Sequence, residues 1–275
     1  MERTDEFIAL QKKIADMDMA GDYQPLLAVT ERYVALAAEL YGKEDAQYAN
    51  ALNEYAGAYR NLGQYAQAEP IYMEALKVMG GSVGQMSQEY ATVLNNLAGM
   101  YRLDRKYSKS EDAFLQVRNI YRQTVGTGHF LYTSCLNNLG LLYQDMGRYS
   151  EAAELHRTCL SIFDETGAEA KIARATTTMN LASALEGEGK LNEARTLLEN
   201  AMDLYDQTVG KGHPLYAHAL NSLAAYYVKT GTPELAKQAL EETLAIVEKG
   251  YGRDSASYAL IQRNLETVES LSGGG

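Results

Sequence analysis

Asparagine side chains recur along this sequence at a fixed interval and offer its most regular chemistry. Two series keep the interval that separates Asn53 from Asn95, or twice that interval: Asn53, Asn95, Asn137 and Asn221, and Asn96, Asn138 and Asn180. A carboxamide both donates and accepts hydrogen bonds, as the main chain of an extended peptide requires. The two series therefore predict a ladder of peptide-binding amides. Alternatively, some of these amides bond to a neighbouring helix and only stiffen the stack.

Two arginines keep the same interval, because Arg102 follows Arg60 as Asn95 follows Asn53. A guanidinium group can bind a carboxylate through two parallel hydrogen bonds. The pair therefore predicts a ligand that is acidic or that ends in a free C-terminal carboxylate. Two alternatives stay open at this point: the arginines are solvated, or Glu54 pairs with one of them.

The histidines and cysteines do not indicate a metal site. His129 and His213 lie two intervals apart in equivalent loops, which predicts a repeated role in closing the loop. His213 and His218 lack the i, i+4 spacing of a helical metal pair. Cys135 and Cys159 lie on predicted helices without metal or redox spacing, and we interpret them as buried structural residues. We expect no metal and no cofactor.

No catalytic residues are expected either. The sequence lacks a glycine-rich phosphate loop, a nucleophile elbow and a catalytic carboxylate pair. Adjacent carboxylates do occur at Asp164 and Glu165 and at Glu241 and Glu242, but we place them on the outer faces of helices, where charge is normally solvated. The protein is therefore predicted not to be an enzyme.

The same interval defines the elements that carry these side chains. Apolar residues at helical spacing, such as Leu94, Leu97 and Tyr101, predict a first helix in each repeat, and a glycine-centred turn such as Gly147 leads to a second helix. Self-similarity at a fixed period is typical of a solenoid, in which each unit buries its apolar face against its neighbours. We therefore predict an all-α protein with one repeat array over residues 1–271.

The predicted boundaries follow from the alignment of the copies. They comprise a divergent first repeat at 4–47, five repeats at 48–89, 90–131, 132–173, 174–215 and 216–257, a capping helix at 258–271 and a flexible tail at 272–275.

The repeats resemble the tetratricopeptide repeat, and in particular its 42-residue form in kinesin light chains. The third copy matches the family pattern at Leu136, Leu139, Gly140, Tyr143, Gly147, Tyr149, Ala152 and Cys159. Departures include Arg105 in place of glycine and Ser110 in place of alanine in the second copy. The resemblance implies a right-handed α-solenoid superhelix of stacked antiparallel helix pairs, with the first helices lining a concave groove. In similar proteins such asparagines hold the main chain of a bound segment.

Composition narrows the possible partners. The 275 residues carry a formal net charge of −11, which would repel a phosphate backbone, so we expect no nucleic-acid binding. No uninterrupted apolar run is long enough to span a membrane, and the acidic start around Glu2 and Asp5 does not resemble a secretory leader. We expect a cytoplasmic protein that does not bind a membrane.

The combined prediction is a non-enzymatic scaffold that binds a peptide or a partner-protein segment in the groove. Two alternatives belong to other classes. The chain could be the sensing or regulatory segment of a larger signalling protein, as its glycine-rich end suggests, or a module that assembles with copies of itself.

Overall fold

The computed structural model describes residues 2–20, 23–163 and 168–272. Its described residues form thirteen α-helices and no strand, which confirms the predicted all-α class. Asp164 and Glu165 and residues 273–275 of the expected tail lie outside the described residues. The chain divides into two compact units, Met1–Leu142 and Tyr143–Gly275.

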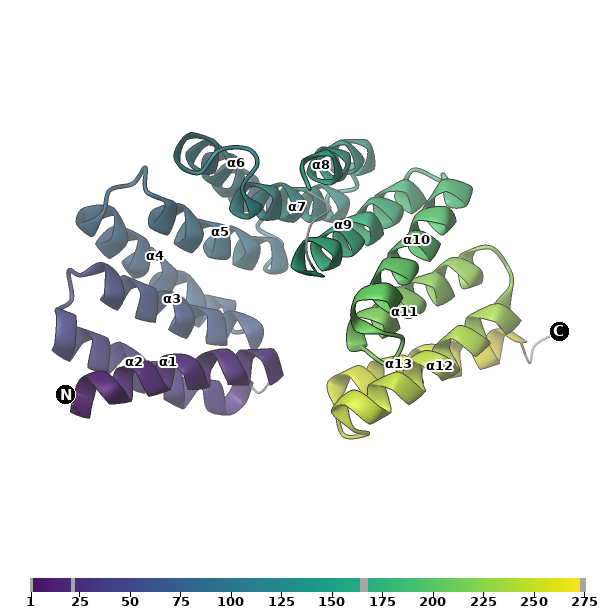
Figure 1. The fold of residues 1–275 in the computed structure, drawn as a ribbon, viewed down its shortest axis with the longest axis horizontal. Coiled ribbons are helices and arrows are strands. Elements are labelled where there is room, and N and C mark those ends of the chain that lie inside the picture. The colour runs from purple at the N-terminus through teal and green to yellow at the C-terminus, as the bar shows by residue number, and fades with distance from the viewer. Residues whose placement is uncertain (1, 21–22, 164–167, 273–275) are drawn as a thin grey trace. The chain divides into compact units, whose positions relative to one another are not determined.

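The first unit consists of antiparallel helix pairs followed by most of α7 (Figure 1). Its helices are α1 (Glu2–Ala20), α2 (Tyr23–Tyr41), α3 (Ala46–Asn61), α4 (Tyr65–Ser82), α5 (Gln88–Leu103), α6 (Tyr107–Thr124) and α7 (Phe130–Asp145). We call the odd-numbered helices first helices and the even-numbered ones second helices. The first helices α1, α3 and α5 each pack against the second helix of their own pair, as α3 does against α4.

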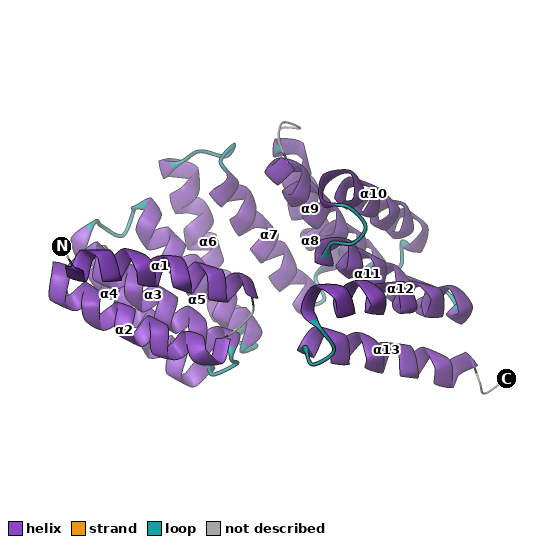
Figure 2. Ribbon diagram, turned by 60° about the horizontal axis from the view of Figure 1, so that its bottom comes forward, coloured by secondary structure: helices purple, strands orange, loops and turns teal. Residues whose placement is uncertain are grey.

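The second unit repeats this arrangement (Figure 2). It contains the end of α7 and then α8 (Tyr149–Ile162), α9 (Ala168–Gly187), α10 (Leu191–Val209), α11 (Pro214–Lys229), α12 (Pro233–Tyr251) and α13 (Ala256–Ser272). The expected terminal helix is α13, which packs against α12 and has no second helix after it in the described residues.

A side chain at one repeated position caps the start of several first helices. Asp45 accepts a hydrogen bond from the Gln47 amide at 2.7 Å, and Ser87 does the same for Tyr90 at 3.1 Å. The equivalent His129 and His213 each accept through Nδ1 from the amide two residues further on, at 3.2 Å. Such caps satisfy amides that have no partner within the helix. The predicted loop-closing role of the two histidines is thereby confirmed.

The turn between the paired helices uses a left-handed residue. Gly63, Gly147, Gly189 and Gly231 have φ between 70° and 79°. Arg105 occupies the same place with φ of 57°, the one non-glycine residue with positive φ among the described residues. The second copy therefore keeps the turn despite its departure from the family pattern, at some steric cost. The other departure, Ser110, is buried and donates to the Ala98 carbonyl at 2.8 Å.

The core lies between the paired helices. Ala68, Ala152, Ala194 and Ala236 have no exposed surface, as expected for points of close helix contact. Cys135 and Cys159 are also fully buried and form no disulfide, and burial raises the pKa of the Cys159 thiol to about 12. Their predicted structural role agrees with this placement, because a thiol kept neutral is a poor nucleophile.

Candidate functional site

Five of the seven predicted asparagines form hydrogen-bonded pairs between successive first helices. The Nδ2 of Asn96 donates to the Oδ1 of Asn53 at 2.9 Å, and the Nδ2 of Asn138 donates to the Oδ1 of Asn95 at 3.4 Å. In the second unit Asn264 donates to Asn221 in the same way at 3.2 Å. Each pair therefore ties one first helix to the next. These bonds are the contacts to a neighbouring helix that the alternative interpretation, a role in stiffening the stack, requires.

The pairs nevertheless retain hydrogen-bonding capacity. A paired bond uses one donor and one acceptor of two carboxamides, and a carboxamide has two N–H groups and two lone pairs. The side-chain nitrogen of Asn95 and the side-chain oxygen of Asn138 have no other partner within the described part of the chain. All nine predicted site residues are half-buried, namely Asn53, Arg60, Asn95, Asn96, Arg102, Asn137, Asn138, Asn180 and Asn221. In each unit, we call the side of the first helices that carries these asparagines the asparagine face.

The amide pairing has one interruption in the second unit. Met179 and Ser222 occupy the two positions at which the neighbouring repeats have asparagine. Met179 is buried, and Ser222 donates to the His218 carbonyl of its own helix at 3.1 Å. First helices α9 and α11 therefore lack the amide bond that joins α11 to α13.

The structure shows the hydrogen-bond partner of Arg60 and the position of Arg102 on its helix. Arg60 donates through Nε and Nη2 to the Oδ1 of Asn61, at 3.1 and 3.0 Å. Arg102 lies in the last turn of α5 and is half-buried. Glu54 accepts a hydrogen bond from Asn53 at 3.2 Å and forms no ion pair with either arginine in the described residues, so the expected alternative of such a pair is wrong.

A polar recess of about 220 Å³ lies in the first unit between α1, α2, α3, α4 and α5. We call it the Tyr72 recess. Most of its lining is polar and includes three of the predicted site residues; the lining residues are Ile14, Asp18, Leu26, Asn53, Glu54, Gly57, Ala58, Arg60, Asn61, Tyr72 and Asn96. The sequence therefore predicted part of this site, on α3 and α5.

Tyr72 is the unusual residue of the recess. Its side chain is fully buried, and its hydroxyl has no hydrogen-bond partner among the described residues. Burial is the main cause that raises its pKa to about 12, so the phenol is neutral at physiological pH. Buried polar groups are normally paired, and an unpaired one calls for an explanation such as a bound ligand or water.

The equivalent position in the second unit is occupied by a satisfied polar group. His156, two repeats after Tyr72, is fully buried, and its Nε2 lies 3.0 Å from the Nε2 of Gln144. An amide nitrogen only donates, so this ring nitrogen accepts and the proton of the neutral ring is on Nδ1. Gln144 also donates to the Asn180 carbonyl at 3.0 Å. Burial lowers the pKa of His156 to about 4.

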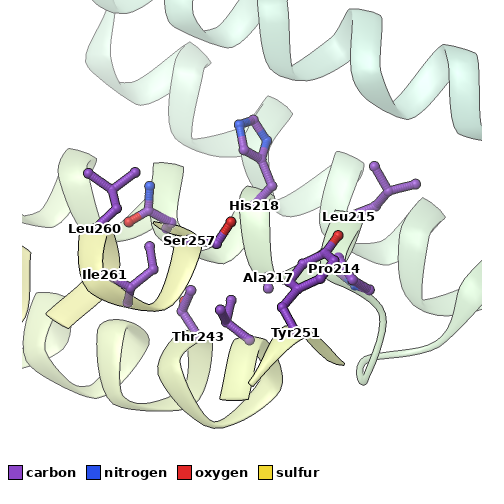
Figure 3. Close-up of a pocket in the computed structure, with 11 residues that line it drawn as sticks. Pro214, Leu215, Ala217, His218, Thr243, Tyr251, Ser257, Leu260 and Ile261 are labelled. Atoms are coloured by element: carbon purple, nitrogen blue, oxygen red, sulfur yellow. The ribbon is translucent and has the colours of Figure 1, made fainter. Parts of the chain in front are cut away.

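Two apolar recesses flank the Asn221–Asn264 bond on the asparagine face of the second unit. One has a volume of about 310 Å³ and is lined mainly by apolar residues of α11, α12 and α13, including Pro214, Val247 and Ile261 (Figure 3). The other, of about 330 Å³, includes Ala225 and Val228 of α11 and Val268 of α13. Partly exposed Tyr251 and Leu260 line the first recess, which therefore suits an apolar side chain.

Sequence reasoning missed three polar residues of the Tyr72 recess, namely Asp18, Asn61 and Tyr72. The sequence did contain a signal for Tyr72. The equivalent positions of later repeats include Phe114, Leu198 and Leu240, so a tyrosine stands where most repeats have an apolar residue. The many packing tyrosines of the repeat conceal this signal. Asp18 belongs to the divergent first repeat, where it takes the place of Arg60.

Two other features bear on the class of site. Among the described residues, no group of three or more histidine, cysteine or carboxylate side chains is placed to hold a metal ion. Across the same residues, no helix has the combination of length and apolar character needed to cross a bilayer.

Comparison with solved structures identifies the fold. Repeats from Podosopora anserina, described as "putative kinesin light chain nearly identical TPR-like repeats", are 23% identical over 73% of this chain and 95% of theirs, with a TM-score of 0.60. BtubC (BKLC) from P. vanneervenii is 17% identical over 88% of this chain and 93% of its own, with a TM-score of 0.62. The apo form of the quorum sensor NprR from B. thuringiensis is 14% identical over 94% of this chain and 68% of its own, with a TM-score of 0.68.

Family comparison covers more than half of the chain. No curated protein matches it. The tetratricopeptide repeat family matches residues 49–78, 89–165 and 173–249, which include helices of both units. The two longer segments begin two repeat intervals apart, and all three segments lie on the helix pairs described above. The chain therefore belongs to the tetratricopeptide repeat family, and its fold is similar to that of the kinesin-light-chain repeats compared above.

Proposed function

We propose that this protein is a non-enzymatic scaffold that binds an extended segment of a partner protein on its asparagine face. Its membership of the tetratricopeptide repeat family supports a protein-interaction scaffold in general. The observation that carries the finer proposal is the half-buried amide pairing, which recurs in both units.

The geometry of the pairs favours a main-chain ligand. Each amide pair holds its side chains in place, so less conformational entropy is lost when a ligand binds to them. The unused donor of Asn95 and acceptor of Asn138 match the alternating C=O and N–H groups of an extended backbone. The apolar recesses beside Asn221 offer places for side chains of the same segment.

The charge of the segment is less constrained. The expectation of an acidic or C-terminal carboxylate ligand depended on Arg60 and Arg102. Arg60 is bonded to Asn61, and it shares its recess with the carboxylates of Asp18 and Glu54. An acidic segment is therefore poorly supported at Arg60, and at Arg102 it stays a prediction.

The test begins with affinity capture on the immobilised full chain, followed by calorimetry with the segment that is found. Asn95→Ala, Asn137→Ala and Arg102→Glu should each weaken binding by about 1–3 kcal/mol. Asn200→Ala is the matched control, because Asn200 is an exposed asparagine on second helix α10. Thermal melts establish that each variant is folded. If all three variants bind as the wild type does, the segment does not use the asparagine face.

Two other functions have one supporting observation each. The quorum sensor NprR is a longer chain that contains a similar fold, which favours a sensing or regulatory segment within a larger protein. Exposed Tyr251 and Leu260 beside the apolar recess favour self-assembly through α12 and α13. Light scattering at increasing protein concentration distinguishes the second of these, since a monomer at all concentrations contradicts self-assembly.

A further inference from the structure

We propose that the Tyr72 recess binds a protonated primary amine, supplied by a lysine side chain or by the amino terminus of a peptide. This inference deepens the proposed function, because the amine would belong to the bound segment. It stands on the unpaired Tyr72 hydroxyl and on the arrangement of charged groups around it.

Two chains of hydrogen bonds converge on the recess, and each ends on a carboxylate. In one, Arg60 donates to Asn61, and Asn61 donates to Asp18 Oδ1 at 3.1 Å. In the other, Asn96 donates to Asn53, and Asn53 donates to Glu54 Oε1. The second oxygen of each carboxylate has no hydrogen-bond partner in the part of the chain that the structure describes. Each chain thus ends on a negatively charged acceptor that is available to a ligand.

The Tyr72 hydroxyl supplies a third acceptor. Tyr72 comes from α4 and reaches α3, so that its oxygen would lie 3.8 Å from a Cβ placed on Gly57, another lining residue. The hydroxyl end of the side chain therefore faces the recess, where it is fully buried and unpaired among the described residues. An ammonium group has three N–H donors, which matches the two carboxylate oxygens and the hydroxyl oxygen.

The charge balance favours a cation. Although the Glu54 side chain reaches solvent, the protein around it partly desolvates the carboxylate and raises its pKa, and the negative charge of Asp18 raises it further. The hydrogen bond from Asn53 and the charge of Arg60 oppose this shift without cancelling it. A cation between the two carboxylates would relieve their repulsion. The described residues offer no third histidine, cysteine or carboxylate for a metal ion, so an organic ammonium fits better.

A carboxylate ligand is the opposite possibility, and the recess fits it less well. An incoming carboxylate would be repelled by Asp18 and Glu54, whose two negative charges outnumber the single positive charge of Arg60 in the lining. Ordered water is the other possible occupant, because it too would satisfy Tyr72. Both possibilities are separated from the proposal by the choice of ligand in the experiment.

The experiment is a ligand-observed NMR titration of the full chain with capped amino acids. N-acetyl-lysine N-methylamide presents only a side-chain ammonium, and alanine N-methylamide presents only an amino-terminal one. N-acetyl-norleucine N-methylamide has the lysine chain without the charge, and acetate represents a carboxylate. We expect one of the two amines to bind at least about tenfold more tightly than the norleucine compound, and the stronger of them identifies the source of the ammonium.

Variants then locate the binding. Glu54→Gln and Asp18→Asn should each weaken amine binding about fivefold or more, and Tyr72→Phe should weaken it about threefold. Glu44→Gln is the matched control, since it removes an exposed carboxylate of the same unit outside the recess and should leave binding unchanged. Asp18 and Glu54 are exposed at the mouth of the recess, so their variants are expected to fold.

Several results would overturn the proposal. These are failure of both amines to bind more tightly than the norleucine compound, acetate binding that exceeds amine binding, no binding of any compound, or amine binding that Glu54→Gln and Asp18→Asn leave intact. None of these affects the scaffold proposal, because the compounds contain no partner segment. Conversely, loss of the partner segment's binding in Asn137→Ala with intact amine binding would leave the recess assignment in place.

Discussion

A second helix of each unit carries a buried polar side chain at the same repeated position. The side chain in the second unit has a hydrogen-bond partner, whereas the hydroxyl of the one in the first unit has none among the described residues. In the second unit, His156 is paired with Gln144, which also reaches the Asn180 carbonyl. In the first unit, Tyr72 occupies the equivalent place on α4, and Arg60 stands where Gln144 stands. Arg60 bonds to Asn61 and not to Tyr72, so among the described residues the hydroxyl remains unpaired beside a polar recess.

The difference separates a structural group from one that can serve a ligand. A buried polar group with an internal partner contributes to stability, whereas the same group without one costs free energy until something binds it. The His156 position is complete within the fold. The Tyr72 position is incomplete, which is a reason to place ligand binding in the first unit.

The largest expected effect concerns acid sensitivity, which would sharpen the comparison. The folded-state pKa of His156 is lowered by burial to about 4, below its ordinary value of 6.5. The unfolded chain therefore binds the proton more readily, and stability falls as the pH drops from about 6.5 to about 4. The full loss should be on the order of 3 kcal/mol. Urea denaturation at a series of pH values measures it.

His156→Leu is the matched variant, because Leu198 and Leu240 occupy the equivalent position in later repeats. It should flatten the pH dependence over this window, while Tyr72→Phe should not, since the phenol does not titrate there. A wild-type protein whose stability is constant between pH 6.5 and pH 4 would contradict the assignment of His156 as a buried neutral group.

A pair of substitutions at equivalent positions gives the next largest effect. Gln144→Leu removes the hydrogen-bond partner of the His156 ring and of the Asn180 carbonyl, so it should destabilise the protein by about 2 kcal/mol. Arg60→Leu should cost less than about 0.5 kcal/mol, because among the described residues the hydrogen bonds of Arg60 go to its neighbour Asn61. The denaturant midpoints of the two variants measure these losses of stability. Equal losses would contradict the contrast between the paired His156 and the unpaired Tyr72.

The smallest effect is expected for Tyr72→Phe. Removing a hydroxyl that has no partner in the described part of the protein should leave stability unchanged or raise it by up to about 1 kcal/mol. A thermal melt of the unliganded protein measures this. A loss of more than about 1 kcal/mol would show that the hydroxyl is well satisfied, and the contrast with His156 would then disappear.

The fold could be predicted almost entirely from the sequence, because it depends on spacing. The constant interval between copies predicted the helix pairs, and the equivalent positions of His129 and His213 predicted a shared role in the loops, where the structure shows that each caps a helix. The backbone conformation of a single turn was less predictable. The sequence did not indicate that Arg105 would adopt the left-handed conformation of the equivalent glycines, since arginine rarely does so.

The candidate site was predictable only in part. The asparagine series indicated side chains on a common face, but periodicity alone does not state which amide bonds to which. The pairing of Asn53 with Asn96, one residue beyond the repeat interval, follows from how successive first helices pack. The Tyr72 recess depends on residues of α1 and α4 as well as α3 and α5. Asp18 lies in a divergent copy, and Tyr72 resembles a packing tyrosine until its unpaired hydroxyl is seen.

The interruption at Met179 and Ser222 has a mechanical consequence. Elsewhere on the asparagine face of the second unit, the Asn221–Asn264 bond couples α11 to α13 through a directional contact. Between α9 and α11 that position offers a thioether side chain and a hydroxyl already engaged with its own helix. Thermal bending of the second unit should therefore concentrate between α9 and α11, where a guest could widen or narrow the spacing of the repeats at little energetic cost.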